Sequence, residues 1–184
     1  MSDDHLNTAG GSFVLSSLAP GGSNNTAFGD AALHENTTGQ DNTVSGVNAL
    51  FSNTTGNANT AIGVGTLGSN TTGFGNTAVG RNALLNSTGN KNIGIGYQAG
   101  ETLTTGNNNI VIGNQGAGNE SQTIRVGTAQ TRTFIAGINV AGVSGATVVV
   151  DGNGQLGVPF SSARYNRTSP RWEPRVRSCC SSSR

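Results

Sequence analysis

Asn59-Thr-Ala-Ile-Gly63 and Asn76-Thr-Ala-Val-Gly80 are two copies of a unit that the chain repeats six times. Each copy opens on Asn and reaches a Gly at the fourth position after it. The even spacing of the copies is typical of a solenoid, in which each repeat forms one coil. We expect the opening Asn and the following Gly to mark corners of the coils. These pairs are Asn25 and Gly29, Asn42 and Gly46, Asn59 and Gly63, Asn76 and Gly80, Asn92 and Gly96, and Asn109 and Gly113.

The residues between these corners favour short β-strands. Segments such as Thr-Ala-Ile and Ile-Val-Ile supply the β-branched and small side chains that strands prefer. Gly and Asn tolerate positive φ, which lets the backbone turn a corner. Frequent Gly and the lack of helical apolar spacing oppose a helix. The sequence therefore predicts an all-β fold, a parallel β-solenoid of about 17 residues per coil, in which six coils span about 29 Å.

Two rows of apolar side chains recur at fixed places in the unit. The fourth residue of each copy is mostly apolar, and a Leu lies eight residues after the opening Asn in four copies. We expect both rows to form core ladders: Phe28, Ile62, Val79, Ile95 and Ile112 in the first, and Leu33, Leu50, Leu67 and Leu84 in the second. Only 33% of the residues are hydrophobic and 5% are aromatic. A core this thin predicts a need for caps or partner chains.

The repeat divides the chain into four segments. Residues 25–121 hold the six-coil array, and residues 1–24 look like a degenerate N-terminal coil or cap. Residues 122–160 read as a β-rich neck of separate short strands, and residues 161–184 carry no strand pattern. In the neck, Asp151-Gly-Asn-Gly154 is a strong hairpin signal between two apolar segments.

Charge is distributed unevenly along the 184 residues. Residues 1–163 hold four basic and eight acidic side chains, a net charge of −4, whereas residues 164–184 hold six Arg and one Glu, a net charge of +5. The slightly acidic, aromatic-poor body argues against nucleic-acid binding. No signal peptide is recognisable at the N-terminus, and no apolar run is long enough for membrane insertion as a helix. Cys179 and Cys180 are the first cysteines, so the body has no disulfide framework.

Catalytic, cofactor and metal signatures are weak. Gly63-Val-Gly-Thr-Leu-Gly68 matches a dinucleotide-binding string, but it falls on the corner glycines of the repeat. Asp30 and Asp41 occupy unrelated positions of the unit, unlike the regular Asp of calcium-binding β-rolls. His34 has no neighbouring ligand at metal spacing, and no Ser has a His base near it. We expect a non-enzymatic protein with no cofactor and no metal.

The Thr-Thr-Gly turns that close three copies are the main polar surface feature. They begin at Asn36, Asn53 and Asn70. Stacked rows of Thr and Asn would serve chiefly for turns and for hydrogen bonds between coils. The same flat polar face would also suit contact with a carbohydrate or another surface polymer, or an ice-binding role.

The Asn-Thr-Ala-Ile-Gly opening, the Ala-Leu step and the Asn-Thr-Thr-Gly turn resemble the head repeats of trimeric surface adhesins and, more closely, the repeat arrays of phage-type tail fibres. The resemblance covers residues 7–113. It implies a left-handed β-roll, a homotrimer, a structural role in attachment to a carbohydrate or protein receptor, and a place in a virion tail fibre or on a bacterial cell surface. The alternative is a fragment of a bacterial trimeric autotransporter adhesin that binds host matrix.

The neck resembles the segment that precedes an intramolecular chaperone of the endosialidase type, which begins Ser-Ser-x-Arg-Tyr-Lys. Ser161-Ser-Ala-Arg-Tyr165 matches, but Asn166 stands where the family has Lys. Ser161 or Ser162 corresponds to the family's self-cleavage serine, and without the Lys we predict no cleavage and no catalytic residue. Residues 166–184 are interpreted as an out-of-frame tail, which predicts a low yield of soluble trimer.

Overall fold

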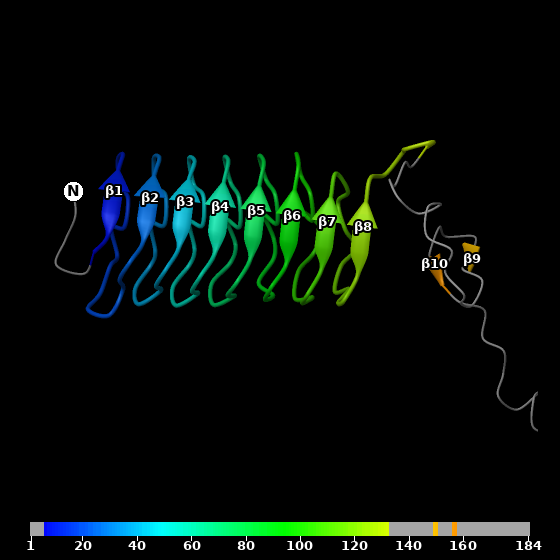
Figure 1. The fold of residues 1–184 in the computed structure, drawn as a ribbon. Helices are drawn as coiled ribbons and strands as arrows, with labels where there is room; N and C mark the ends of the chain where they lie inside the picture. The colour runs from blue at the N-terminus through cyan, green and yellow to red at the C-terminus, as the bar shows by residue number, and fades with distance from the viewer. Residues whose placement is uncertain (1–5, 133–148, 151–155, 158–184) are drawn as a thin grey trace, which may run out of the picture. The chain divides into compact units, whose positions relative to one another are not determined.

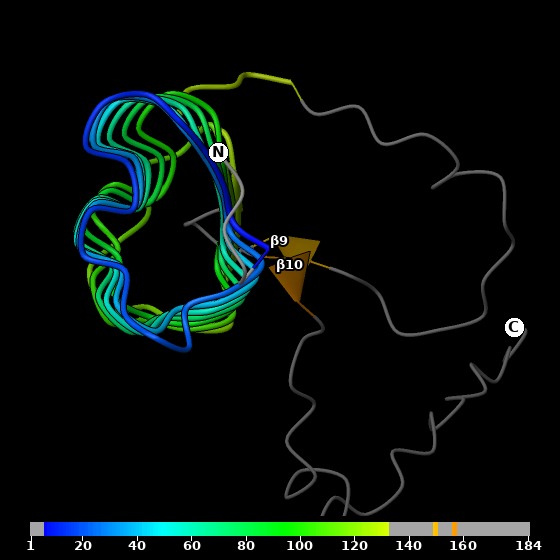
Figure 2. The same ribbon diagram turned by 90° about the vertical axis from the view of Figure 1, so that its left-hand side faces the viewer.

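The computed structural model describes residues 6–132, 149–150 and 156–157, and these residues are all-β. Eight three-residue strands form one parallel sheet in which each strand pairs with its neighbours in sequence (Figure 1). They are β1 (Thr8–Gly10), β2 (Thr26–Phe28), β3 (Thr43–Ser45), β4 (Thr60–Ile62), β5 (Thr77–Val79), β6 (Ile93–Ile95), β7 (Ile110–Ile112) and β8 (Ile124–Val126). Along the stacking direction the coils superpose on one outline (Figure 2). The predicted parallel β-solenoid is confirmed.

The strand register sets the length of each coil. Thr26 pairs with Thr43, which reproduces the spacing of the repeat in the sequence. The first coil is one residue longer, because Thr8 pairs with Thr26, and the last is three residues shorter, because Ile110 pairs with Ile124. The seven coils that join the eight strands span about 34 Å at the usual spacing between strands.

The solenoid extends beyond the predicted array, residues 25–121, at both ends. β1 pairs in register with β2, and Asn7 is only 2% exposed, so residues 7–24 form a complete layer. Residues 123–126 were expected to form a separate strand of the neck, but β8 pairs in parallel with β7. Backbone pairing therefore continues for one layer after the Asn-to-Gly pattern has ended, because every residue except Pro carries a main-chain donor and acceptor.

The middle residue of each strand points into the solenoid, and its two neighbours point outward, as strand alternation requires. Most of this inward row is small and fully buried: Ala27, Val44, Ala61, Ala78, Gly94 and Val111. The expected core ladder of Phe28, Ile62, Val79, Ile95 and Ile112 is therefore wrong. Four of its members are between 39% and 47% exposed, and Val79 is half-buried. Hydrophobicity alone does not fix which face of a three-residue strand turns inward.

The second predicted ladder is part of the core. Leu33, Leu50, Leu67 and Leu84 are fully buried. Their φ angles lie between 51° and 53°, in the left-handed region. This backbone costs a non-glycine residue about 1–2 kcal/mol, whereas burying a Leu side chain contributes about 1.5–3 kcal/mol. The apolar contact in the interior thus offsets the unfavourable backbone at each of these positions.

The opening Asn residues form a continuous buried column of amides, which we call the first Asn column. Its members are Asn7, Asn25, Asn42, Asn59, Asn76, Asn92 and Asn109, none more than 2% exposed. In its middle, Asn59 Oδ1 accepts hydrogen bonds from the backbone N and the Nδ2 of Asn76, at 3.0 and 3.1 Å. Asn59 Nδ2 donates to Asn42 Oδ1 at 3.1 Å and to the Gly73 carbonyl at 2.9 Å. Each amide therefore binds the coil before it and the coil after it.

The corners are made by the glycines and by the residue before each opening Asn. Gly29, Gly46, Gly63, Gly80 and Gly96 have φ between 118° and 149°, and Gly113 has a φ of 58°. A Cβ atom on Gly63 would lie 2.8 Å from the carbonyl carbon of Gly80. The opening Asn was expected to adopt positive φ itself, but the preceding residue does so, as Asn24 (59°) and Lys91 (55°) illustrate. Asn is thus required for its amide and not for its backbone.

A second, shorter Asn column runs beside the first. Asn53 Nδ2 donates to Asn36 Oδ1 at 2.8 Å, and Asn70 Nδ2 donates to Asn53 Oδ1 at 3.0 Å. The next coil places Ser87 at this position, three residues after its Leu, and Ser87 is fully buried. Asn86 is exposed and does not continue the column. Because Ser87 takes the place of the column Asn, only one Thr precedes Gly89 where the other turns have two, so the residue missing from this coil is a Thr. The Oδ1 atom of Asn70 is consequently left without a hydrogen-bond partner.

The fifth coil of the array rebuilds the core with a different set of residues. Gly100 stands where earlier coils have Leu, and Leu103 is fully buried three residues later. A Cβ atom on Gly94 or Gly100 would lie 2.7 or 2.6 Å from the side chain of Leu84. Leu84 therefore fills the space that these two glycines leave, and Leu103 supplies the aliphatic volume that the coil would otherwise lack.

A separate compact unit begins at residue 134. Within it, β9 (Val149–Val150) and β10 (Leu156–Gly157) pair in antiparallel fashion, with Leu156 opposite Val150. This antiparallel pairing is the one expected of the predicted hairpin, whose turn residues Asp151-Gly-Asn-Gly154 lie outside the described residues. Residues 161–184, including Ser161, Ser162 and Asn166, lie outside the described residues, so the predictions for the tail are not addressed by the structure.

Candidate functional site

The outer face of the sheet changes character along the solenoid. The first residue of the strand is Thr in β1 to β5 and Ile in β6 to β8. Because the third residue also points outward, the last three strands present one contiguous group, which we call the aliphatic strip: Ile93, Ile95, Ile110, Ile112, Ile124 and Val126. The last two are 70% and 69% exposed. Contiguous exposed apolar surface of this kind marks interaction sites in folded proteins.

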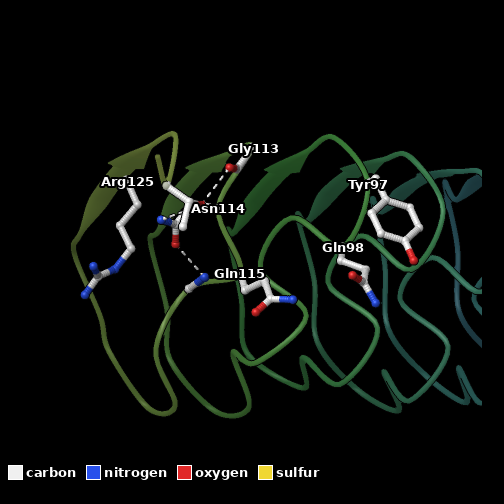
Figure 3. Close-up of a pocket in the computed structure, with 8 residues that line it drawn as sticks. Tyr97, Gln98, Gly113, Asn114, Gln115 and Arg125 are labelled. Atoms are coloured by element: carbon white, nitrogen blue, oxygen red, sulfur yellow. Dashed lines mark hydrogen bonds between the residues drawn. The ribbon is translucent and has the colours of Figure 1, made fainter. Parts of the chain in front are cut away.

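An open groove of about 500 Å³ lies beside the same three coils. Its walls come from the corners that follow β6, β7 and β8, and from Arg125 within β8 (Figure 3). Tyr97, directly after the corner glycine of the fifth coil, is 64% exposed and stands at one end of the view. Gln98 and Gln115, at equivalent positions of adjacent coils, lie between Tyr97 and Arg125.

Asn114 fixes the floor of this groove. Its Nδ2 donates to the Gly127 carbonyl at 2.8 Å, and its Oδ1 accepts from the backbone N of Gly116 at 2.8 Å. Thr128 Oγ1 donates to the Gly113 carbonyl at 3.1 Å, which ties the segment after β8 to the preceding coil. The groove is therefore built on backbone that side chains hold in place.

Arg125 and Glu120 close the end of the solenoid core. Arg125 occupies the inward position of β8, where most other strands have Ala or Val, and it pairs with Val111 in register. Its Nη2 lies 2.7 Å from Glu120 Oε2, and its Nε donates to both carboxylate oxygens. This hydrogen bonding to Glu120 raises the pKa of Arg125, against a smaller opposing effect of burial. A neutralised ion pair thus replaces the next apolar layer.

The Thr-Thr-Gly turns are used chiefly within the solenoid. The hydroxyls of Thr37 and Thr54 donate to the backbone carbonyls of Thr54 and Thr71 in the next coil, at 2.9 and 3.1 Å. Thr88 makes the equivalent bond to Thr104 at 3.3 Å. These hydroxyls contribute hydrogen bonds between coils, which supports the structural interpretation of the Thr rows.

The dinucleotide-binding string and the candidate metal ligands are not arranged as such sites require in the described residues. Gly63 and Gly65 of the GxGxxG string are left-handed turn positions, with φ of 128° and 69°, and no helix begins there. In the part of the chain that the structure describes, no three His, Cys, Asp or Glu side chains are placed to hold a metal ion. The same part contains no helix long and apolar enough to cross a membrane.

Comparison of the chain with protein-family models, with curated proteins and with solved structures gives no match. Of the predicted residues, the corner glycines and the Leu row lie where they were expected. The first apolar row lies on the outer face instead, and its last two members, Ile95 and Ile112, belong to the aliphatic strip. The groove was not predicted, although two signals mark it in the sequence: the break of the repeat at Tyr97, and a charged Arg125 at the inward strand position.

Proposed function

We propose that this chain is a structural module of a fibre or surface adhesin. In this role the solenoid is a stiff spacer, on a virion tail fibre or a bacterial cell surface, and it presents surfaces for attachment to a host cell or polymer. The continuous hydrogen bonding between coils supports a mechanical role.

We further propose that the chain acts as a homotrimer whose subunits associate side by side through the aliphatic strip. The observation that carries this proposal is the replacement of outward Thr by Ile in β6 to β8. Thr already serves at this position in five strands, so the sheet does not need Ile there for its own stability. Burial of six aliphatic side chains against partner chains would also compensate for the narrow core of Ala and Leu.

The test uses the full chain and the variant Ile93→Thr/Ile110→Thr/Ile124→Thr. These changes introduce the residue that the first five strands carry at the same position, so they preserve strand propensity. Light scattering coupled to size exclusion should show a trimer whose share rises with protein concentration for the parent chain. The triple variant should remain monomeric with an unchanged far-ultraviolet circular dichroism spectrum. A parent chain that is monomeric at every concentration would refute the side-by-side assembly.

Ice binding is the less well supported alternative. The outward Thr residues of β1 to β5 are regularly spaced, at one per coil. However, the turn hydroxyls of Thr37 and Thr54 are engaged in bonds between coils, and the Thr row on the sheet gives way to Ile after β5. Ice crystals grown with the purified protein should keep their ordinary shape, and faceted crystals would favour this alternative.

A further inference from the structure

We propose that the groove beside β6 to β8 binds an uncharged saccharide. The groove holds about 500 Å³, within the range of about 300–1,000 Å³ that is usual for small-ligand sites. It lies on corners and not on the outer strand face, so it is distinct from the aliphatic strip. The inference gives a ligand class to the proposed attachment role and rests on that role for its biological meaning.

Tyr97 provides the apolar element of such a site. Tyr97 is 64% exposed and directly follows the corner glycine Gly96, whose φ is 118°. At the equivalent position the other coils of the array carry Asp30, Val47, Val64, Arg81 or Asn114, so Tyr is peculiar to this coil. An exposed aromatic ring on a fixed backbone offers a flat surface for the C–H face of a pyranose, at little cost in side-chain entropy.

Gln98 and Gln115 provide the polar element. Both line the groove, and the structure records no hydrogen bond from either side-chain amide within the described residues. Each amide carries two donors and one acceptor oxygen, which matches the paired donor and acceptor character of sugar hydroxyls. Their backbones are one coil apart, so the two amides can bind hydroxyls along one sugar ring while Asn114 stays bound to Gly127.

The charge of the groove favours a neutral ligand. Arg125 is the one charged residue among those that line it, and Glu120 offsets that charge at 2.7 Å. A carboxylate or sulfate on the ligand would have to compete with Glu120, because the guanidinium of Arg125 is already paired with that side chain. We therefore expect neutral oligosaccharides to bind in preference to sialylated or sulfated ones.

The test begins with an array of immobilised neutral and acidic oligosaccharides, probed with the full chain in the presence of a thiol reductant. The neutral oligosaccharide with the strongest signal is then titrated, with saturation-transfer difference NMR as the readout. Tyr97→Ala and Gln98→Ala/Gln115→Ala should each weaken binding about tenfold or more, as expected for central contact residues. Phe74→Ala, which removes an exposed ring that does not line the groove, should bind like the parent chain. Tyr97→Phe, which keeps the ring, should bind more tightly than Tyr97→Ala.

Three results would overturn the proposal: retention of no saccharide on the array, preference for acidic over neutral saccharides, or unchanged binding by Tyr97→Ala. Thermal unfolding followed by circular dichroism verifies that each variant is folded. The variant Ile93→Thr/Ile110→Thr/Ile124→Thr should retain saccharide binding, so loss of assembly and loss of binding are separate outcomes. A trimer without saccharide binding would leave the structural role intact and refute only the ligand.

Discussion

Substitution of Asn59 by Ala tests whether the first Asn column holds the solenoid together. The Asn59 side chain is fully buried and makes four hydrogen bonds, two to Asn76, one to Asn42 and one to the Gly73 carbonyl. At about 0.5–1.5 kcal/mol each, their loss costs about 2–6 kcal/mol, and the backbone N–H of Asn76 is left buried without an acceptor. We therefore expect Asn59→Ala to lower the free energy of unfolding by about 4 kcal/mol.

Urea denaturation followed by circular dichroism measures this change. The matched control is Asn57→Ala, two residues away, where an exposed Asn accepts one hydrogen bond from the backbone N of Gln40 at 2.7 Å. Its loss should cost less than about 1 kcal/mol. If Asn59→Ala costs no more than the control, coil stacking does not depend on the column and the reasoning fails.

Asn59→Asp gives a second readout at the same position. The carboxylate cannot donate to Asn42 Oδ1 or to Gly73, and burial would raise the pKa of the new Asp above its unfolded value. The folded state would then bind a proton that the unfolded state releases, so the stability of this variant should fall as the pH rises above about 4. A stability difference from the parent chain that does not vary with pH would show that the site is hydrated.

Two further substitutions examine the second column and the corners. Ser87→Asn should give the unpaired Oδ1 of Asn70 a donor and raise the free energy of unfolding by about 1 kcal/mol; a loss of stability in urea would show that the shortened turn has no room for the amide. Gly63→Ala should cost about 3 kcal/mol or more, because φ is 128° and the new Cβ would meet Gly80 at 2.8 Å. Gly75→Ala should cost about 1–2 kcal/mol, because its φ of 66° is one that non-glycine residues adopt in other coils. Equal melting temperatures for the two Ala variants would contradict this account.

The stacking of the coils is predictable from the sequence because the residues that recur in the repeat are those that the backbone geometry and the interior of each coil require. A Gly stands at each corner where φ exceeds 100°, and a Leu enters the interior of four coils. The fixed spacing of these residues leaves few alternatives to a parallel register. The solenoid was predictable from this spacing.

The direction of the side chains was not predictable from hydrophobicity. The strands are three residues long, and in β4 both Ala61 and Ile62 are apolar, so composition favours the larger residue for the interior. The interior of the narrow coil accepts Ala61, and Ile62 remains 44% exposed. The shortness of the strands, which removes the alternation that normally distinguishes two faces, explains the error.

The end of the array and the groove could not be predicted from the repeat pattern, for a different reason. Thr123 replaces the opening Asn, yet its backbone N still donates to Asn109 Oδ1 at 3.0 Å, so the column supports one more layer than the motif indicates. The groove arises from three adjacent coils that each depart from the repeat. Its residues, among them Gln98 and Gln115, are a full coil apart in sequence and come together only when the layers are stacked.

The first Asn column has a direction, since its amides donate toward the N-terminus: Asn42 to Asn25, and Asn59 to Asn42. Among the uniform coils that begin at Asn25, Asn42 and Asn59, a coil that is copied or removed as a whole leaves its new neighbours with the same donors and acceptors in this column. Gene duplication in steps of one whole repeat would thus lengthen or shorten the molecule without a new folding problem. The length of the solenoid can therefore change independently of the segments that are attached to its two ends.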